Sequence, residues 1–237
     1  MVGPDLVPVP SAQLMQVPEA GDPTVGPTDH FENLATLTRD LASFVMPYQF
    51  AIREITTKLE ILRDEFAYVH DYNPIEHVES RVKSPTSIVE KARRRGCPMD
   101  LEAIKHQIRD VAGVRVVCSF EADVYSVFDI LSRQTDVTVV EVEDYISEPK
   151  PNGYRSLHAI VQIPDFLSSG PQIIDVELQM RTVAMDFWAT LEHKIYYKYD
   201  RSVPEGLLAE LHNAAITAAE LDNHMQRLHH EIKGLPA

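Results

Sequence analysis

The most informative segment of the chain is Pro149-Lys150-Pro151-Asn152-Gly153-Tyr154-Arg155-Ser156-Leu157-His158. Its two prolines fix φ, and the Asn-Gly pair readily adopts positive φ, so the sequence predicts a tight loop. The apolar run over residues 157–163 predicts a strand that begins where the loop ends. The loop therefore delivers cations, an aromatic ring, a hydroxyl and an imidazole to the mouth of a strand. Such a set suits a planar base that carries phosphates.

A second predicted strand, residues 172–180, alternates between polar and apolar side chains. Asp175, Glu177 and Gln179 fall on one face, and the residues between them make the other face apolar. Two carboxylates and an amide on one side predict that this face meets a wet cleft or an ion. Hard cations such as Mg²⁺ take carboxylate oxygens, usually with substrate phosphates completing the shell. The alternative is an ordinary strand that faces solvent.

Further upstream, six cations gather on a predicted strand and the helix that follows it. Alternation puts Arg81 and Lys83 on one strand face, while Lys91 and Arg94 share one side of a helix predicted over residues 85–95. Lysine as a point charge and arginine as a fork suit a polyphosphate. A solvated basic helix face is the alternative. The six are Arg81, Lys83, Lys91, Arg93, Arg94 and Arg95.

A β-branched strand follows over residues 112–118, with a carboxylate at its entry. Asp110 stands just ahead of it, and Arg115 lies on the face opposite Val114 and Val116. Taken alone, Asp110 is a turn residue and Arg115 belongs to a buried ion pair.

Together, these motifs over residues 75–200 resemble the RelA/SpoT-type alarmone synthetases. The resemblance implies an α/β (α+β), nucleotidyltransferase-like fold with a mixed five-stranded sheet flanked by helices. It also implies Mg²⁺-dependent transfer of the β,γ-pyrophosphate of ATP to the 3′-hydroxyl of GDP or GTP, with AMP leaving. By resemblance, Arg81 and Arg115 sandwich the adenine, and the ATP-binding residues are Arg81, Lys83, Ser84, Lys91, Arg94 and Arg115.

The same resemblance assigns the acceptor and the metal. Asp110 and Glu177 would be the Mg²⁺ ligands and catalytic residues, with Glu177 as candidate base. Tyr154 would stack on guanine, and the acceptor set would be Lys150, Asn152, Tyr154, Ser156, His158 and Gln179. The acidic run 141–144 resembles a motif that in longer relatives goes with a preference for GDP.

The flanking segments carry helical patterns. Residues 1–28 are proline-rich and predict a disordered tail, and residues 29–72 predict helices interrupted at Pro47. The synthetase domain is expected over 73–200 and a C-terminal helix over 201–237. The resemblance implies a homotetramer, and we expect its subunit contacts at the apolar stripes of both flanking helices. For the first stripe, spacing does not choose between a sister subunit and burial within the same chain, and the latter is the default. Before the last helix, residues 181–182 are expected to open another, with Trp188 in the core and an inward face of Ala184, Phe187, Leu191 and Ile195.

The composition of the chain excludes several classes of protein. The chain has 237 residues, 44% of them hydrophobic, and a formal net charge of −14, which disfavours a general binder of nucleic acid or anionic membrane. Cys97 and Cys118 are expected as buried thiols, and no apolar run has transmembrane length, so a cytoplasmic protein is expected. The pair His70-Asp71 predicts a helix-end turn rather than a hydrolase site.

Three alternatives stay open from the sequence. One is a relative that transfers pyrophosphate to the 3′ end of tRNA, although no stable nucleic-acid partner is predicted. Another is a catalytically silent module that binds nucleotide or single-stranded RNA. The third is a nucleotidyltransferase-like enzyme that releases pyrophosphate instead of AMP.

Overall fold

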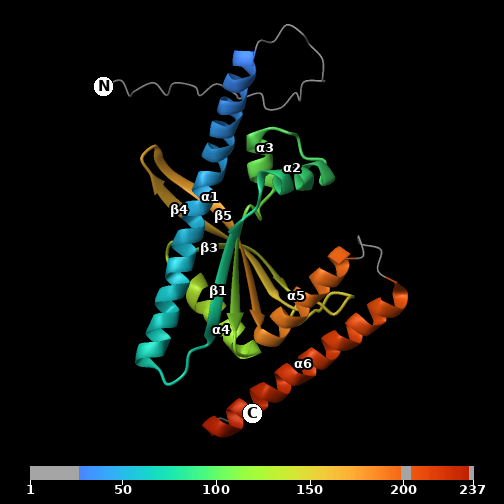
Figure 1. Ribbon diagram of the computed structural model, residues 1–237. Helices are drawn as coiled ribbons and strands as arrows, with labels where there is room; N and C mark the ends of the chain where they lie inside the picture. Colours follow the sequence, from blue (N-terminus) through green and yellow to red (C-terminus); the bar gives the residue numbers. More distant parts are fainter. Residues whose placement is uncertain (1–26, 199–203, 235–237) are drawn as a thin grey trace. The chain divides into compact units, whose positions relative to one another are not determined.

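The computed structural model describes residues 27–198 and 204–234 (Figure 1). The chain divides into two compact units, and the second contains the whole β-sheet. The first comprises residues 27–46 and 83–109, and the second comprises residues 47–82 and the described residues from 110 onward.

The sheet is mixed and five-stranded, in the order β1-β2-β5-β4-β3. Strands β2 and β5 pair in parallel, and the other neighbours are antiparallel. The predicted mixed five-stranded sheet flanked by helices is therefore confirmed. The strands are Ile75–Val82 (β1), Ala112–Cys118 (β2), Thr138–Asp144 (β3), Leu157–Leu167 (β4) and Gly170–Thr182 (β5).

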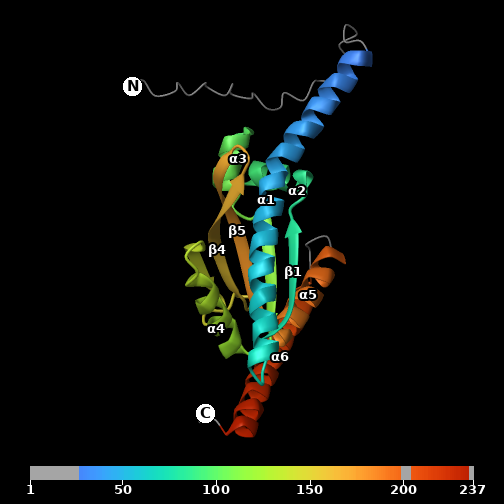
Figure 2. The ribbon, with the colours of Figure 1, turned by 90° about the vertical axis from the view of Figure 1, so that its left-hand side faces the viewer.

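One face of the sheet is apolar and builds the main core. Val116 on β2 and Leu178 on β5 are fully buried, as is Leu131 on α4 (Glu121–Ser132). Figures 1 and 2 show α4 and the C-terminal half of α1 on this side of the sheet, with α5 and α6 on the other. Each large aliphatic side chain buried here contributes roughly 1.5–3 kcal/mol to stability. The opposite face is left for polar side chains.

Helix α1 is one helix, Pro27–Val69, with Pro47 inside it. The predicted break at Pro47 is therefore wrong. An interior proline costs about 3 kcal/mol because it removes a hydrogen bond and crowds the preceding turn. The apolar stripe continues past it, however, and Ile55 and Leu59 are fully buried. Burial within the chain thus stabilises the helix beyond the proline, and this part of the stripe is not available to a partner.

The junction of β5 and the next helix differs from the prediction. Arg181 and Thr182 are the last residues of β5, and α5 runs Val183–Lys198. The Thr182 hydroxyl accepts a hydrogen bond from the backbone N–H of Met185 at 3.2 Å, which satisfies a free donor of the first helical turn. The polar alternation of β5 therefore extends to Arg181.

The buried face of α5 is also shifted from the predicted one. Phe187 is 65% exposed and Leu191 is 40% exposed, whereas Trp188 and Ala189 are buried. The predicted core position of Trp188 is confirmed, and its indole N–H donates to the carbonyl of Leu211 at 2.9 Å. The buried face is thus displaced by about one residue, to Met185, Trp188 and Ala189.

Helix α6, Glu205–Lys233, follows the predicted C-terminal helix. Its apolar stripe faces solvent: Leu221 is 56% exposed and Met225 is 49% exposed. The helix packs through smaller or polar residues instead, because Ala215 and Asp222 are buried. The apolar stripe that the heptad spacing identifies is thus not buried in the core of the chain itself.

In the first unit, α2 (Pro85–Arg94) begins where the Ser-Pro signal predicts. The Ser84 hydroxyl accepts a hydrogen bond from the backbone N–H of Ser87 at 3.2 Å and caps the helix. The guanidinium of Arg95 donates at 2.9 Å to the last carbonyl of α3 (Leu101–Gln107), joining the two helices.

Several smaller predictions can be compared with the structure. The predicted tail, residues 1–28, lies outside the described residues except for residues 27 and 28, which belong to α1. His70 and Asp71 form a turn after that helix, and both cysteines are free, buried thiols, as expected. Within the described chain, no helix has the length and apolarity needed to span a membrane.

Candidate active site

A row of polar side chains crosses the face of the sheet opposite the apolar core. Strand pairing aligns Glu79 with Arg115, Arg115 with Gln179, Gln179 with His158, and His158 with Glu143. Residues aligned in this way project from the same face, because side chains alternate along each strand. The row therefore brings Arg115, predicted for ATP, into line with Gln179 and His158, predicted for the acceptor.

A parallel row runs beside it. Arg81 pairs with Gly113, and Gly113 pairs with Glu177. A Cβ built on Gly113 would have the Arg81 carbonyl oxygen, at 3.8 Å, as its nearest neighbour. The missing side chain leaves the space between Arg81 and Glu177 uncovered, so a ligand can approach the sheet there.

The spacing of the two predicted adenine contacts follows from this register. Glu79 faces Arg115 and Arg81 faces Gly113, so Arg81 and Arg115 are diagonal neighbours on one face. Diagonal pairs in antiparallel strands lie roughly 7–8 Å apart. That is about two stacking gaps of 3.5 Å, which is the space a planar base needs between two guanidinium groups.

Of the two predicted metal ligands, Glu177 lies on β5, and Asp110 lies in the turn just before β2, the parallel neighbour of β5. Glu177 is half-buried, and its Oε2 accepts a hydrogen bond from Nε2 of Gln179 at 2.8 Å. Asp110 lies three residues before Gly113, the strand partner of Glu177, which is at most about 10 Å of extended backbone. Two carboxylates fit a hard cation whose shell is completed by phosphates. Among the described residues no cluster of three or more His, Cys, Asp or Glu is placed to hold a metal.

The predicted acceptor loop is closed by its own backbone. Gly153 donates to the Lys150 carbonyl at 2.8 Å, and Lys150 donates to the Tyr154 carbonyl at 3.1 Å. The side chain of Asn152 accepts from the backbone N–H of Tyr154 at 3.1 Å, and Gly153 has a φ of 90°. Asparagine and glycine therefore serve the turn as the sequence predicts.

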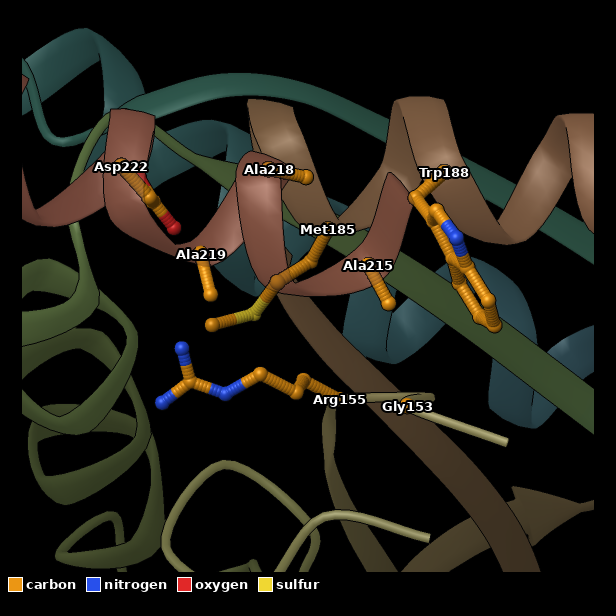
Figure 3. Close-up of a pocket in the computed structure, with 8 residues that line it drawn as sticks. All are labelled: Gly153, Arg155, Met185, Trp188, Ala215, Ala218, Ala219 and Asp222. Atoms are coloured by element: carbon orange, nitrogen blue, oxygen red, sulfur yellow. The ribbon is translucent and has the colours of Figure 1, made fainter. Parts of the chain in front are cut away.

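Helices α5 and α6 support the same loop. Asn152 donates to Glu192 of α5 at 3.2 Å. A Cβ on Gly153 would lie 2.5 Å from the Cβ of Ala215 on α6, so only glycine fits there. Figure 3 shows the gap between loop and helix, which measures about 10 Å³ and holds no more than a single water. It is a packing gap and not a ligand site.

Arg155 is a structural cation rather than a ligand of the acceptor. Its guanidinium donates to the carbonyl of Ile146 at 2.9 Å and to Glu121 of α4 at 3.2 Å. Figure 3 shows the side chain running beneath Met185. Arg155 therefore ties the two ends of the loop to the fold.

Tyr154 stands at the centre of a polarised hydrogen-bond chain. Nη2 of Arg181 donates to its hydroxyl at 2.6 Å, and that hydroxyl lies 2.7 Å from Nε2 of His158. Because arginine only donates, the hydroxyl proton is available to Nε2. Burial lowers the pKa of His158 to about 4, helped by the charges of Arg181 and Lys150. His158 is therefore neutral at pH 7, with its own proton on Nδ1.

Lys150 lies at the open side of the loop. Its ammonium is 4.0 Å from the ring centroid of Tyr145 and 5.2 Å from that of Tyr154. Both are cation–π distances, and they hold an exposed lysine near the predicted guanine contact. The lysine is thus positioned as the loop's anion-binding group.

The structure does not bring Ser156 to this face. Its side chain is fully buried, and its hydroxyl donates to the carbonyl of Met180 at 3.1 Å. The hydroxyl stabilises the β4–β5 pairing, so its predicted contact with the acceptor has no support in this geometry. The Ser84 hydroxyl is similarly engaged as a helix cap.

The remaining predicted donor residues belong to the first unit. Lys83 and Lys91 are half-buried, and Arg94 is exposed on α2. Arg93 and Arg95 are also exposed, as expected of a solvated helix face. The helix therefore presents both the predicted ligands and the predicted bystanders at its surface.

Two residues of the polar face escaped the sequence analysis. Arg181 is only 5% exposed, and besides Tyr154 it contacts Gln179 and Asp186. The signal for Arg181 was present, since it continues the alternation of Glu177 and Gln179. It was overlooked because residues 181–182 were assigned to a helix. Nothing local marks Asp186.

The edge strand β3 carries the acidic run. Glu141 and Glu143 are exposed, and Glu143 pairs with His158 of the polar row. The acidic run therefore borders the acceptor side of the sheet, and its effect on the choice between GDP and GTP stays a prediction.

Comparison with known proteins bears on this site. A family model described as a region found in RelA / SpoT proteins matches residues 80–202. GTP pyrophosphokinase YwaC of Bacillus subtilis is 45% identical over 86% of this chain and 97% of its own length. GTP pyrophosphokinase YjbM of the same species is 41% identical over 80% of this chain and 89% of its own length.

A solved structure is similar over most of the chain. It is the small alarmone synthetase 1 of Bacillus subtilis bound to its product pppGpp, with a TM-score of 0.78 and 40% identity. The match covers 82% of this chain and 99% of that one. The similarity thus extends over most of both chains.

Proposed function

The chain belongs to the RelA/SpoT family, and from that premise we propose that it is a small alarmone synthetase that makes (p)ppGpp. It transfers the β,γ-pyrophosphate of ATP to the 3′-hydroxyl of GDP or GTP and releases AMP. One observation carries this proposal. Glu177 and Gln179 lie in rows that lead to Arg81 and Arg115 on one side and to His158 on the other.

The donor ATP is assigned to arginines of the polar face and to the cations that begin at Lys83. Arg81 and Arg115 take the adenine between their guanidinium planes, which the diagonal register supports. Lys83, Lys91 and Arg94 neutralise the triphosphate, lysine as a point charge and arginine as a fork. A contact of Ser84 with ATP stays a prediction.

The acceptor is held by the loop and the adjoining strands. Tyr154 stacks on guanine, with Asn152 shaping the turn beside it. Lys150 binds the acceptor phosphates as the cation, and neutral His158 contributes an Nδ1–H donor. Gln179 contacts the acceptor beside Glu177, to which it is hydrogen-bonded.

Asp110 and Glu177 would hold Mg²⁺ together with the ATP phosphates. When bound, the ion neutralises charge that builds on the transferred group. The protein's own contribution is positioning: Gln179 fixes the Glu177 carboxylate, and the cations fix the phosphates. Glu177 also faces the acceptor side and is the candidate to accept the 3′-hydroxyl proton. A metal-bound carboxylate is a weak base, so orientation of the hydroxyl is its principal role.

The exposed stripes of α5 and α6 suit assembly into a homotetramer. Phe187, Leu221 and Met225 are 65%, 56% and 49% exposed, and they line a largely apolar groove of about 780 Å³. A monomer seldom leaves so continuous an apolar surface in water. The subunit contacts would therefore involve α5 and α6 rather than the buried part of α1.

Product analysis tests the proposed function. The protein is incubated with Mg²⁺, ATP labelled in the β and γ phosphates, and GMP, GDP, GTP or tRNA in separate reactions. Chromatography should show AMP appearing together with a guanine nucleotide that has gained both labelled phosphates. Labelled tRNA would instead support the tRNA-modifying alternative, and release of pyrophosphate without AMP would indicate nucleotidyl transfer. Absence of any product would support a silent binding module.

A further inference from the structure

One carboxylate oxygen joins the two sides of the polar face. Oδ1 of Asp186, in the first turn of α5, lies 3.2 Å from Nη1 of Arg181 and 3.5 Å from Nη1 of Arg115. Arg181 in turn holds the Tyr154 hydroxyl at 2.6 Å. Asp186 thus lies between a residue assigned to adenine and a residue that orients the one assigned to guanine.

The two arginines are held very differently. Arg181 is 5% exposed and donates to Tyr154, Gln179 and Asp186 at 2.6–3.2 Å. The Arg115 side chain is 29% exposed, and its two ion pairs, with Asp186 and Glu79, both measure 3.5 Å. The buried Nε of each arginine has no hydrogen-bond partner, so the contacts of the terminal nitrogens make the difference. Arg181 is fixed, whereas Arg115 can change partners at small cost.

A change of partner at Arg115 alters the charge felt by Arg181. When Arg115 turns its guanidinium to an adenine, Asp186 loses one of its two cationic partners. The charge of Asp186 then acts on Arg181 alone, which shortens that ion pair. The guanidinium of Arg181, which donates a hydrogen bond to Tyr154, is then held more firmly. A Tyr154 ring held in this way loses less freedom when guanine stacks on it.

We propose that Asp186 is a positioning residue that couples the two nucleotide sites, so that donor binding tightens acceptor binding. The inference rests on the proposed function. Linkage makes the effect reciprocal: the acceptor must strengthen donor binding by the same factor. Allosteric couplings between sites are typically about 5-fold or more, and we expect a value in that range.

Calorimetric titration of the full chain with GDP measures this coupling directly. The titration is run without and with a saturating ATP analogue whose α,β bridge is methylene, so no turnover occurs. The wild type should bind GDP about 5-fold more tightly when the analogue is present. In Asp186→Asn, which keeps the size of the side chain, the two affinities should agree within about twofold.

Glu79→Gln is the matched control, because Glu79 lies at the same 3.5 Å from Arg115 but does not contact Arg181. It should keep the wild-type coupling. Arg181→Lys is the second variant should Asp186→Asn fail to fold: it retains the charge but cannot reach Tyr154 and Asp186 together, so it should lose the coupling. A purely structural role would weaken GDP binding equally with and without the analogue.

The outcomes are distinct. Coupling that survives in Asp186→Asn, or is absent from the wild type, overturns the inference and leaves the proposed function standing. Failure of the wild type to bind either nucleotide removes both.

Discussion

The acceptor loop and the donor helix both offer cations to a nucleotide, but the fold holds them by different means. In the loop, Tyr154 is fixed by Arg181, Asn152 by Glu192 and Lys150 by neighbouring rings. The first two contacts join segments far apart in the chain, whereas the rings around Lys150 are close to it in sequence. On α2, by contrast, the spacing of Lys91 and Arg94 comes from one helix, whose arginines are exposed.

The two regions differ in the step at which their side chains lose conformational entropy. The loop side chains lose their freedom when the protein folds, so the acceptor site is largely preorganised. An exposed arginine keeps up to about 2 kcal/mol of rotamer entropy, which it loses only when the phosphate binds. Substitutions in the loop should therefore act through structure, and substitutions on the helix should act through charge.

The largest expected effect lies where the donor and acceptor meet. Glu177→Gln should lower turnover by at least about 100-fold, because it removes the negative charge proposed to hold Mg²⁺ beside the transferred group. The amide oxygen of the new glutamine can still accept the hydrogen bond from Gln179, so the local structure should be kept. AMP release measures the rate. Asp175→Asn is the matched control, since Asp175 lies on the same face of β5 and accepts from Gln162 at 3.0 Å. Near-normal turnover of Glu177→Gln would remove Glu177 from the mechanism.

Two neighbouring arginines of α2 test the assignment of the ATP-binding residues. Arg94→Ala should raise the KM for ATP about 10-fold or more, because a hydrogen bond between charged groups is worth about 1.5–3 kcal/mol. Thermal stability should hardly change, since Arg94 is exposed. Arg93→Ala is the matched control, being exposed on the same helix and expected to leave the KM unchanged. Equal effects of both would mean that the helix contributes only a diffuse field.

Much of this arrangement follows from local pattern. Alternation over residues 172–180 placed Glu177 on a polar face, and the Ser84-Pro85 signal located α2. The structure adds what depends on contacts between distant segments. Burial of Ser156 requires the pairing of β4 with β5. The position of Asp186 beside Arg115 depends on α5 packing over β2.

The acceptor loop can be tested at its closest approach to α6. Gly153→Ala should raise the KM for GDP about 10-fold while leaving that for ATP nearly unchanged. The backbone φ at residue 153 is 90°, which disfavours any side chain, and the added methyl would lie 2.5 Å from the Cβ of Ala215. Gly96→Ala is the matched control: its φ is 67°, but nothing lies within 4 Å of the added carbon. It should cost about 1–3 kcal/mol of stability and spare both KM values.

A second substitution separates crowding from backbone strain. Ala215→Gly in the Gly153→Ala protein removes the contact but keeps the positive φ, so the KM for GDP should recover in part. Complete absence of recovery would assign the whole effect to strain.

The smallest effect at pH 7 concerns the neutral histidine of the loop, because its contribution changes only at lower pH. The folded-state pKa of His158, about 4, lies below the ordinary value of 6.5, so the unfolded chain takes up the proton first. Stability is therefore complete above about pH 6.5 and falls as the pH drops toward 4, by up to about 3 kcal/mol. Denaturant unfolding of His158→Gln should show a smaller loss over this window. His77→Gln, at an exposed position of β1, should keep the wild-type slope. If both variants keep it, the imidazole is not held neutral, and the preorganised character of the acceptor loop does not extend to His158.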